Sequence, residues 1–105
     1  MPSVHFVERL NNVRPLPDSP GEWESGYWVI AEDTAQRLVG GDLYLHSAQA
    51  EESHFGGTIL SYRLHDDPAH PEIHGRVVFR IQPTPQHKGV QAGRAGWGNE
   101  KKIVW

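Results

Sequence analysis

The 105-residue chain contains no cysteine. Without thiols it has no disulfide, no thiolate nucleophile and no cysteine-ligated zinc site. It also lacks any apolar run near the ~20 residues that a helix needs to cross a bilayer. Its first residues, MPSVHFVERL, lack the basic-then-apolar plan of a secretory signal. These absences favour a cytoplasmic protein with no membrane partner.

The chain also lacks an excess of basic residues, since ten Lys and Arg oppose thirteen Asp and Glu for a formal net charge of −3. That balance argues against general affinity for nucleic acid. The distribution is uneven, because residues 83–105 carry four basic residues and one acidic residue, whereas residues 1–82 carry six and twelve. The basic end could bind an anion locally, within the ~10 Å range of screening, or be a solvated surface.

Short runs of β-branched and aromatic residues, separated by glycine and proline, predict strands. The clearest is RVVFRIQ, whose alternation places Val77, Phe79 and Ile81 on the inner face and leaves three polar residues on the outer face: Arg76, Arg80 and Gln82. No βαβ alternation and no internal repeat is present. The predicted strands are residues 3–9, 26–30, 42–46, 56–64, 76–82 and 101–105.

One segment, AEDTAQRLV (31–39), has helical spacing, with Ala35 and Leu38 on its apolar face. Acidic residues in its first turn and the glycine pair after it are typical helix start and stop signals. Proline and glycine make residues 11–22 and 83–99 long loops. We therefore expect a single domain over residues 1–105 of the α+β, mostly β class: a small curved antiparallel sheet or barrel of five or six strands with one or two short helices.

The loop HKGVQAGRAGWG (87–98) is rich in glycine, but it is not a phosphate loop. Lys88 precedes Gly89, no Ser or Thr follows a Gly-Lys pair, and the glycines do not give G-x-G-x-x-G. What remains is a basic loop in which Lys88 and Arg94 could neutralise phosphate and Trp97 could stack on a base. The alternative is that Trp97 folds back to close the core.

Four tryptophans in 105 residues is a high number. Trp23, Tyr27 and Trp28 could wall a slot for a planar base or a cation. The alternative is core packing, which we favour for Trp28 because it lies within a strand. Trp23 lies between two glutamates and is the better ligand candidate.

Residues 65–74 hold three histidines among carboxylates, in the spacing H-x4-H-x3-H. Histidine and carboxylate can bind a metal, but a proline-containing loop does not fix the ring orientations. We therefore expect no native metal site and no cofactor. No G-x-S-x-G elbow is present, so the sequence identifies no catalytic residue.

The order of segments in residues 25–82 resembles the PUA-like group of small barrels, which includes the EVE, ASCH and YTH domains. The resemblance rests on the tryptophan-bearing GYWVI, a short helix, Gly41-Asp42 before the strand DLYLH, and the later strand FGGTILSYRL. It implies a pocket for RNA or a modified base, and its candidate residues here are Trp23, Trp28, Ser47 and Trp97. Some ASCH relatives are hydrolases that use a lysine, and this implies a possible role for Lys88.

We therefore expect a non-catalytic domain that binds nucleic acid, RNA or DNA, or a modified nucleotide. Lys88, Arg94 and Arg80 would hold phosphate, and Trp97 or Trp23 would stack on a base. One alternative is a hydrolase acting on a modified nucleoside, with Lys88 and Glu52 as base and acid. Another is a protein-interaction module with an exposed apolar patch.

Overall fold

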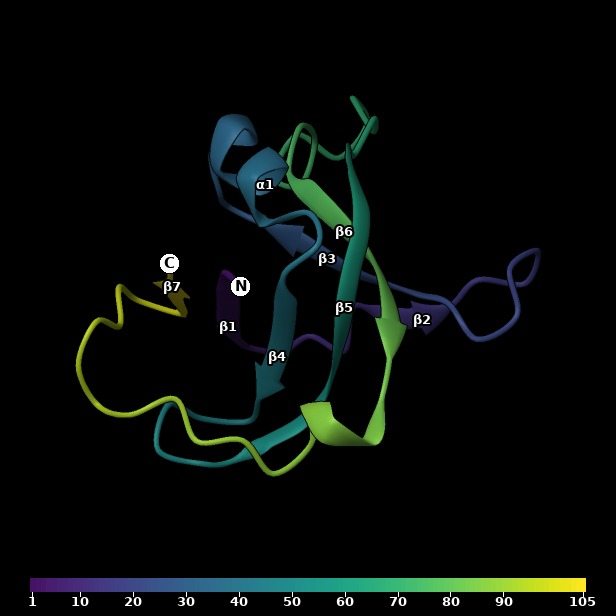
Figure 1. The fold of residues 1–105 in the computed structure, drawn as a ribbon. Coiled ribbons are helices and arrows are strands. Elements are labelled where there is room, and N and C mark those ends of the chain that lie inside the picture. The colour runs from purple at the N-terminus through teal and green to yellow at the C-terminus, as the bar shows by residue number, and fades with distance from the viewer.

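One seven-stranded sheet forms the body of the protein, in a computed structural model that describes all of residues 1–105 (Figure 1). The elements in chain order are β1 (Ser3–Val7), β2 (Val13–Pro15), β3 (Trp23–Trp28), α1 (Glu32–Leu38), β4 (Asp42–His46), β5 (Ser53–Leu64), β6 (Val77–Pro83), the 3₁₀ turn η1 (Pro85–His87) and β7 (Lys101–Val104). The strand order is β2–β3–β6–β5–β4–β1–β7. β1 and β4 pair in parallel, and the other pairings are antiparallel.

The expectation of a mostly β domain with one or two short helices is confirmed, but the expected number of five or six strands is wrong. The seventh strand is β2, which lies inside the segment that we expected to be a loop throughout, residues 11–22. Its Pro15 pairs with Trp23 at the edge of the sheet. Proline has no backbone N–H to donate to a neighbouring strand. An edge strand tolerates it because one side of that strand has no partner.

The expected alternative of a barrel is also wrong, because β2 and β7 are free edges and no ladder joins them. The sheet nevertheless curls strongly, so that β1 and β3, which are not hydrogen-bonded neighbours, face each other. Phe6 of β1 stacks on Trp28 of β3, with ring centroids 3.9 Å apart and planes within 7°. We call the gap between these two strands the seam.

The hydrophobic core lies on the concave face of the sheet, and α1 covers part of it through Ala35 and Leu38. The inward face predicted for β6 is confirmed, since Val77, Phe79 and Ile81 are all buried; Val78, between the first two, is buried as well. No helix is long and apolar enough to cross a membrane. The other core residues come from the strands: Val4, Phe6, Leu43, Leu45 and Ile59.

Candidate functional site

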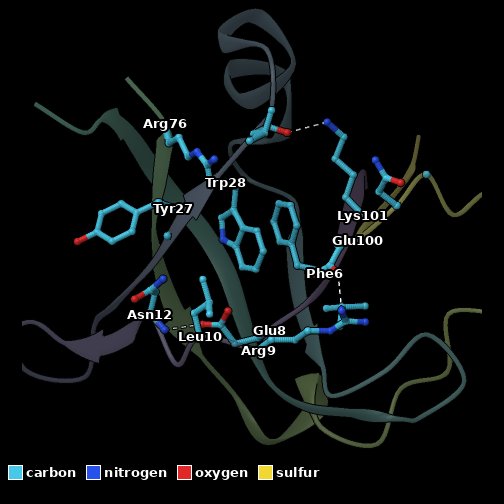
Figure 2. A pocket seen from close by; sticks show the side chains of 15 residues that line it. Phe6, Glu8, Arg9, Leu10, Asn12, Tyr27, Trp28, Arg76, Glu100 and Lys101 are labelled. Carbon is cyan, nitrogen blue, oxygen red and sulfur yellow. Dashed lines mark hydrogen bonds and ion pairs between the residues drawn. The ribbon is translucent and has the colours of Figure 1, made fainter. Parts of the chain in front are cut away.

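A cavity of about 390 Å³ occupies the seam (Figure 2). This volume lies in the range typical of small-molecule pockets. The cavity exists because the curled sheet does not close its last ladder, so side chains and not backbone hydrogen bonds span the gap. We call it the seam pocket; its lining comes from residues 6–10, Asn12, residues 26–29, Arg76 and residues 98–101.

The floor of the seam pocket is the stacked pair of Phe6 and Trp28. Phe6 is fully buried, and Trp28 is half-buried. The Trp28 indole Nε1–H donates to Ser25 Oγ at 3.0 Å. One stacked face and one hydrogen bond therefore fix the indole, and they give the pocket a rigid apolar floor.

One end of the seam pocket is cationic (Figure 2). Lys101 Nζ donates to the backbone oxygen of Val29 at 2.8 Å, which leaves two ammonium hydrogens free. The Arg76 side chain lines the pocket and makes no ion pair or hydrogen bond within the protein. Two positive groups with spare donors therefore flank the aromatic pair at this end, where an anion could bind them.

The opposite end holds Glu8 and Arg9 (Figure 2). Arg9 pairs with Glu100 at 2.8 Å, so its charge is largely balanced. Glu8 has no ion pair, and its Oε1 accepts the backbone N–H of Asn12 at 2.7 Å. Burial raises the pKa of the Glu8 carboxyl above its ordinary value. This end of the pocket therefore presents a fixed hydrogen-bond acceptor.

The outer face of the sheet carries a second polar cluster, which we call the histidine face: His5, Tyr44, His46 and His87. His46 Nδ1 lies 2.8 Å from the carbonyl oxygen of Glu51, so this nitrogen donates. In neutral His46 the Nε2 atom then accepts the Nδ1–H of His5 at 2.9 Å. Burial, together with the nearby His46 and Lys102, lowers the pKa of His5 to about 4.

A second chain of hydrogen bonds on the histidine face joins Asp42, His87 and Thr84. His87 Nε2–H donates to Asp42 Oδ1 at 2.9 Å, and Thr84 Oγ1–H donates to His87 Nδ1 at 2.6 Å. Carboxylate, imidazole and hydroxyl occur in this order in nucleophilic catalysis. In this protein the His87 imidazole is buried. The Thr84 hydroxyl lines neither the seam pocket nor the smaller cavity of about 70 Å³ that adjoins that pocket.

The glycine-rich loop folds back onto the histidine face. Trp97 packs edge-on against His5 and His46, with centroid distances of 6.3 and 5.8 Å, and its Nε1–H donates to the Gly93 carbonyl at 3.0 Å. Gly93 and Gly96 adopt φ values of 79° and 88° beside the Lys102 side chain. Glycine adopts such values without strain, so the glycines let the loop turn tightly around this lysine.

Of the residues that the sequence nominated for ligand binding, Trp28 and its neighbour Tyr27 line the seam pocket. Trp23 packs against Phe55, and Arg80 binds Glu22 and Ser19 on the other side of the sheet. The structure therefore does not gather the nominated residues into one site. Three of them have exposed side chains outside the pocket: Ser47, Lys88 and Arg94.

The pair nominated for hydrolysis, Lys88 and Glu52, consists of two exposed side chains with no ion pair between them. The loop of residues 65–74 is tied internally: His70 Nδ1 lies 3.0 Å from Asp67 Oδ1, and His74 Nδ1 accepts the Asp67 backbone N–H at 2.9 Å. No group of three or more His, Asp or Glu side chains is placed to hold a metal ion.

Sequence reasoning missed six polar residues of the seam pocket: Glu8, Arg9, Asn12, Arg76, Glu100 and Lys101. Each lies at or near the end of a strand, and the sequence patterns marked the apolar residues of these strands and not their polar ends. Their one common signal is that polar residues at strand ends are often functional. No family model, curated protein or solved structure matches the chain.

Proposed function

We propose that this chain is a non-catalytic domain that binds a nucleotide, free or as a unit of a nucleic-acid strand, in the seam pocket. The polarity of the pocket carries this proposal: Arg76 and Lys101 lie at one end, the aromatic floor in the middle, and Glu8 at the other end. A nucleotide has its parts in the same order, with an anionic phosphate, a sugar and a planar base whose edge forms hydrogen bonds.

The charges of the pocket support an anionic ligand. Three of its five charged side chains are cationic, although the whole chain has a net charge of −3. A local positive region on an acidic protein attracts an anion to that place and not to the surface in general. The unpaired guanidinium of Arg76 is suited to bidentate binding of phosphate.

The resemblance of residues 25–82 to PUA-like domains agrees with this class of ligand. Those residues form β3, α1, β4, β5 and β6 in the expected order. Trp28 is the one candidate from that resemblance that lines the seam pocket. A modified base would use the same aromatic floor, and the neighbouring small cavity adjoins the pocket at Asn12, Gly26 and Tyr27.

Calorimetric titration with nucleoside 5′-monophosphates and with short single-stranded RNA and DNA, at two salt concentrations, tests the proposal. We expect saturable binding that weakens with salt, and Arg76→Gln should weaken it about tenfold to a hundredfold, the usual value of a charge-assisted hydrogen bond. The Trp28 indole N–H resonance should shift on binding.

Arg94→Gln is the matched control, because it removes the same charge from an exposed site outside the pocket. The Arg94→Gln variant should bind nucleotides with the same affinity as the unmodified protein. If Arg94→Gln weakens binding and Arg76→Gln does not, the ligand lies on the glycine-rich loop and the seam pocket is not the site. If neither nucleotides nor single-stranded RNA or DNA bind at low salt, the proposed function is wrong. Binding of a protein partner, with little dependence on salt, then becomes the better hypothesis.

A further inference from the structure

We propose that Glu8 makes the seam pocket selective for guanine, presented as an unpaired base. This inference rests on the proposed function, because it assigns the base-binding end of the same pocket. The inference assigns base recognition to Glu8, whereas phosphate binding is assigned to Arg76 and Lys101 at the other end.

The Glu8 carboxylate is held in place from both sides along the chain. Its backbone N–H donates to the His46 carbonyl at 2.8 Å, which continues the pairing of β1 with β4. Its Oε1 atom accepts the Asn12 N–H at 2.7 Å across a tight turn, in which Asn11 has a φ of 56°. A carboxylate with this anchoring presents a defined edge to the pocket.

The accepting capacity of Glu8 is only partly used. A carboxylate offers about four lone-pair sites, and the backbone N–H groups of Asn12 and Leu10 are the protein donors to it. No cation of the protein pairs with Glu8, since the nearby Arg9 is bonded to Glu100. A half-buried charge without a partner is unfavourable unless something donates to it. We therefore expect the ligand to supply the hydrogen-bond donors for this carboxylate.

Guanine matches an ionised carboxylate better than the other bases do, because its N1–H and N2–H donors lie side by side. Hypoxanthine lacks the second of these donors. Adenine and cytosine place a ring-nitrogen lone pair beside their amino group, and uracil has one N–H between two carbonyls. An acceptor-only group repels those lone pairs. Guanine is therefore the base that gives a carboxylate two hydrogen bonds and no repulsion.

These donors form the Watson–Crick edge of guanine, and a base-paired guanine uses them already. The inference therefore specifies a free guanine nucleotide, or a guanine in a single strand or flipped out of a duplex. The same guanine inside a stable duplex should not bind.

Titration with GMP, IMP, AMP, CMP and UMP tests the assignment. We expect GMP to bind about tenfold or more tighter than IMP and UMP, because each hydrogen bond to a charged group has about that effect on affinity. Glu8→Gln should weaken GMP binding by a similar factor and remove the difference between GMP and IMP. Arg76→Gln should weaken all five nucleotides alike. Glu52→Gln, which removes an exposed carboxylate outside the pocket, should change nothing.

Glu8→Asp keeps the charge but shortens the side chain by one methylene, so it also should lose the preference for GMP. Glu8→Asp replaces Glu8→Gln in the test if circular dichroism shows that Glu8→Gln does not fold. If nucleotides bind without a preference for guanine, or if the preference persists in both variants, the assignment of Glu8 is wrong while the proposed function stands. If no nucleotide binds, the proposed function itself fails, and this inference fails with it.

Discussion

Glu8 is a half-buried carboxylate without an ion pair, and burial raises its pKa. An acid whose pKa is raised on folding holds its proton more tightly in the folded chain than in the unfolded chain. The free energy of unfolding therefore falls as pH rises from the unfolded pKa to the folded pKa, and it stays lower above that window. At neutral pH the charge on Glu8 destabilises the fold, which is common for a residue that serves a ligand and not the core.

We expect Glu8→Gln to raise the melting temperature at pH 7 by a few degrees, because the amide oxygen can still accept the Asn12 N–H without a buried charge. Thermal melts followed by circular dichroism at pH 7 and below about pH 4 test this, since Glu8 is protonated at the lower pH. The gain should be present at pH 7 and absent in acid. An equal gain at both values would show that charge is not the cause, and Glu52→Gln should give no gain at either.

The glycine-rich loop and β7 connect the two polar regions of the protein. Residues 93–97 cover the histidine face, whereas residues 98–101 form a wall of the seam pocket. Along β7, Lys101 lines the pocket, while Lys102 reaches the Ala92 carbonyl on the other side. The loop therefore has a structural role that its glycines and Trp97 explain without any phosphate.

Removal of the Trp97 side chain should rehydrate the histidine face. Burial is the largest cause of the low His5 pKa, so we expect Trp97→Ala to raise that pKa from about 4 toward 6.5. Titration of the His5 ring proton by NMR measures the change. Trp105→Ala is the control, because Trp105 is exposed and packs on Arg37; it should leave the His5 pKa unchanged. An unchanged His5 pKa in Trp97→Ala would mean that the strands alone bury the ring.

At the scale of the whole molecule, the sequence predicted what is encoded locally. The alternation in residues 76–82 marked the buried face of β6, and the acidic first turn and glycine pair marked α1 to within a residue of each end. β2 was missed because its three residues include a proline and have no alternation of their own. It forms because β3 offers a partner at the edge of the sheet.

The seam pocket could not be predicted in the same way. It requires β1 to pair with β4 in parallel and the sheet to curl until residue 6 meets residue 28. Both are long-range consequences of strand order, which no local pattern specifies. The same limit explains Trp97, whose two alternatives, base stacking and folding back, differ only in what lies beneath the loop. For Trp28 the favoured alternative, core packing, is confirmed by its stacking on Phe6, and the same side chain also lines the seam pocket.

The neutral state of His5 links the histidine face to the stability of the whole fold. Its pKa is about 4 in the folded protein and 6.5 in the unfolded chain, so between these values the unfolded chain binds more protons. The free energy of unfolding therefore falls as pH is lowered from 6.5 to 4, by at most about 3 kcal/mol for this residue. Urea unfolding across this window should show the fall.

His5→Asn should flatten that fall, because asparagine can donate an N–H toward His46 Nε2 but does not titrate. The contrasting variant is His70→Asn, since the Asp67 carboxylate raises the pKa of His70, which is exposed. A raised pKa stabilises the fold at low pH, and that contribution is lost as pH rises through the folded value. His70→Asn should therefore leave the acid-side loss in place or deepen it. If His5→Asn instead shows the same slope as the unmodified protein, the loss arises from other groups and His5 is not the main acid-sensitive residue.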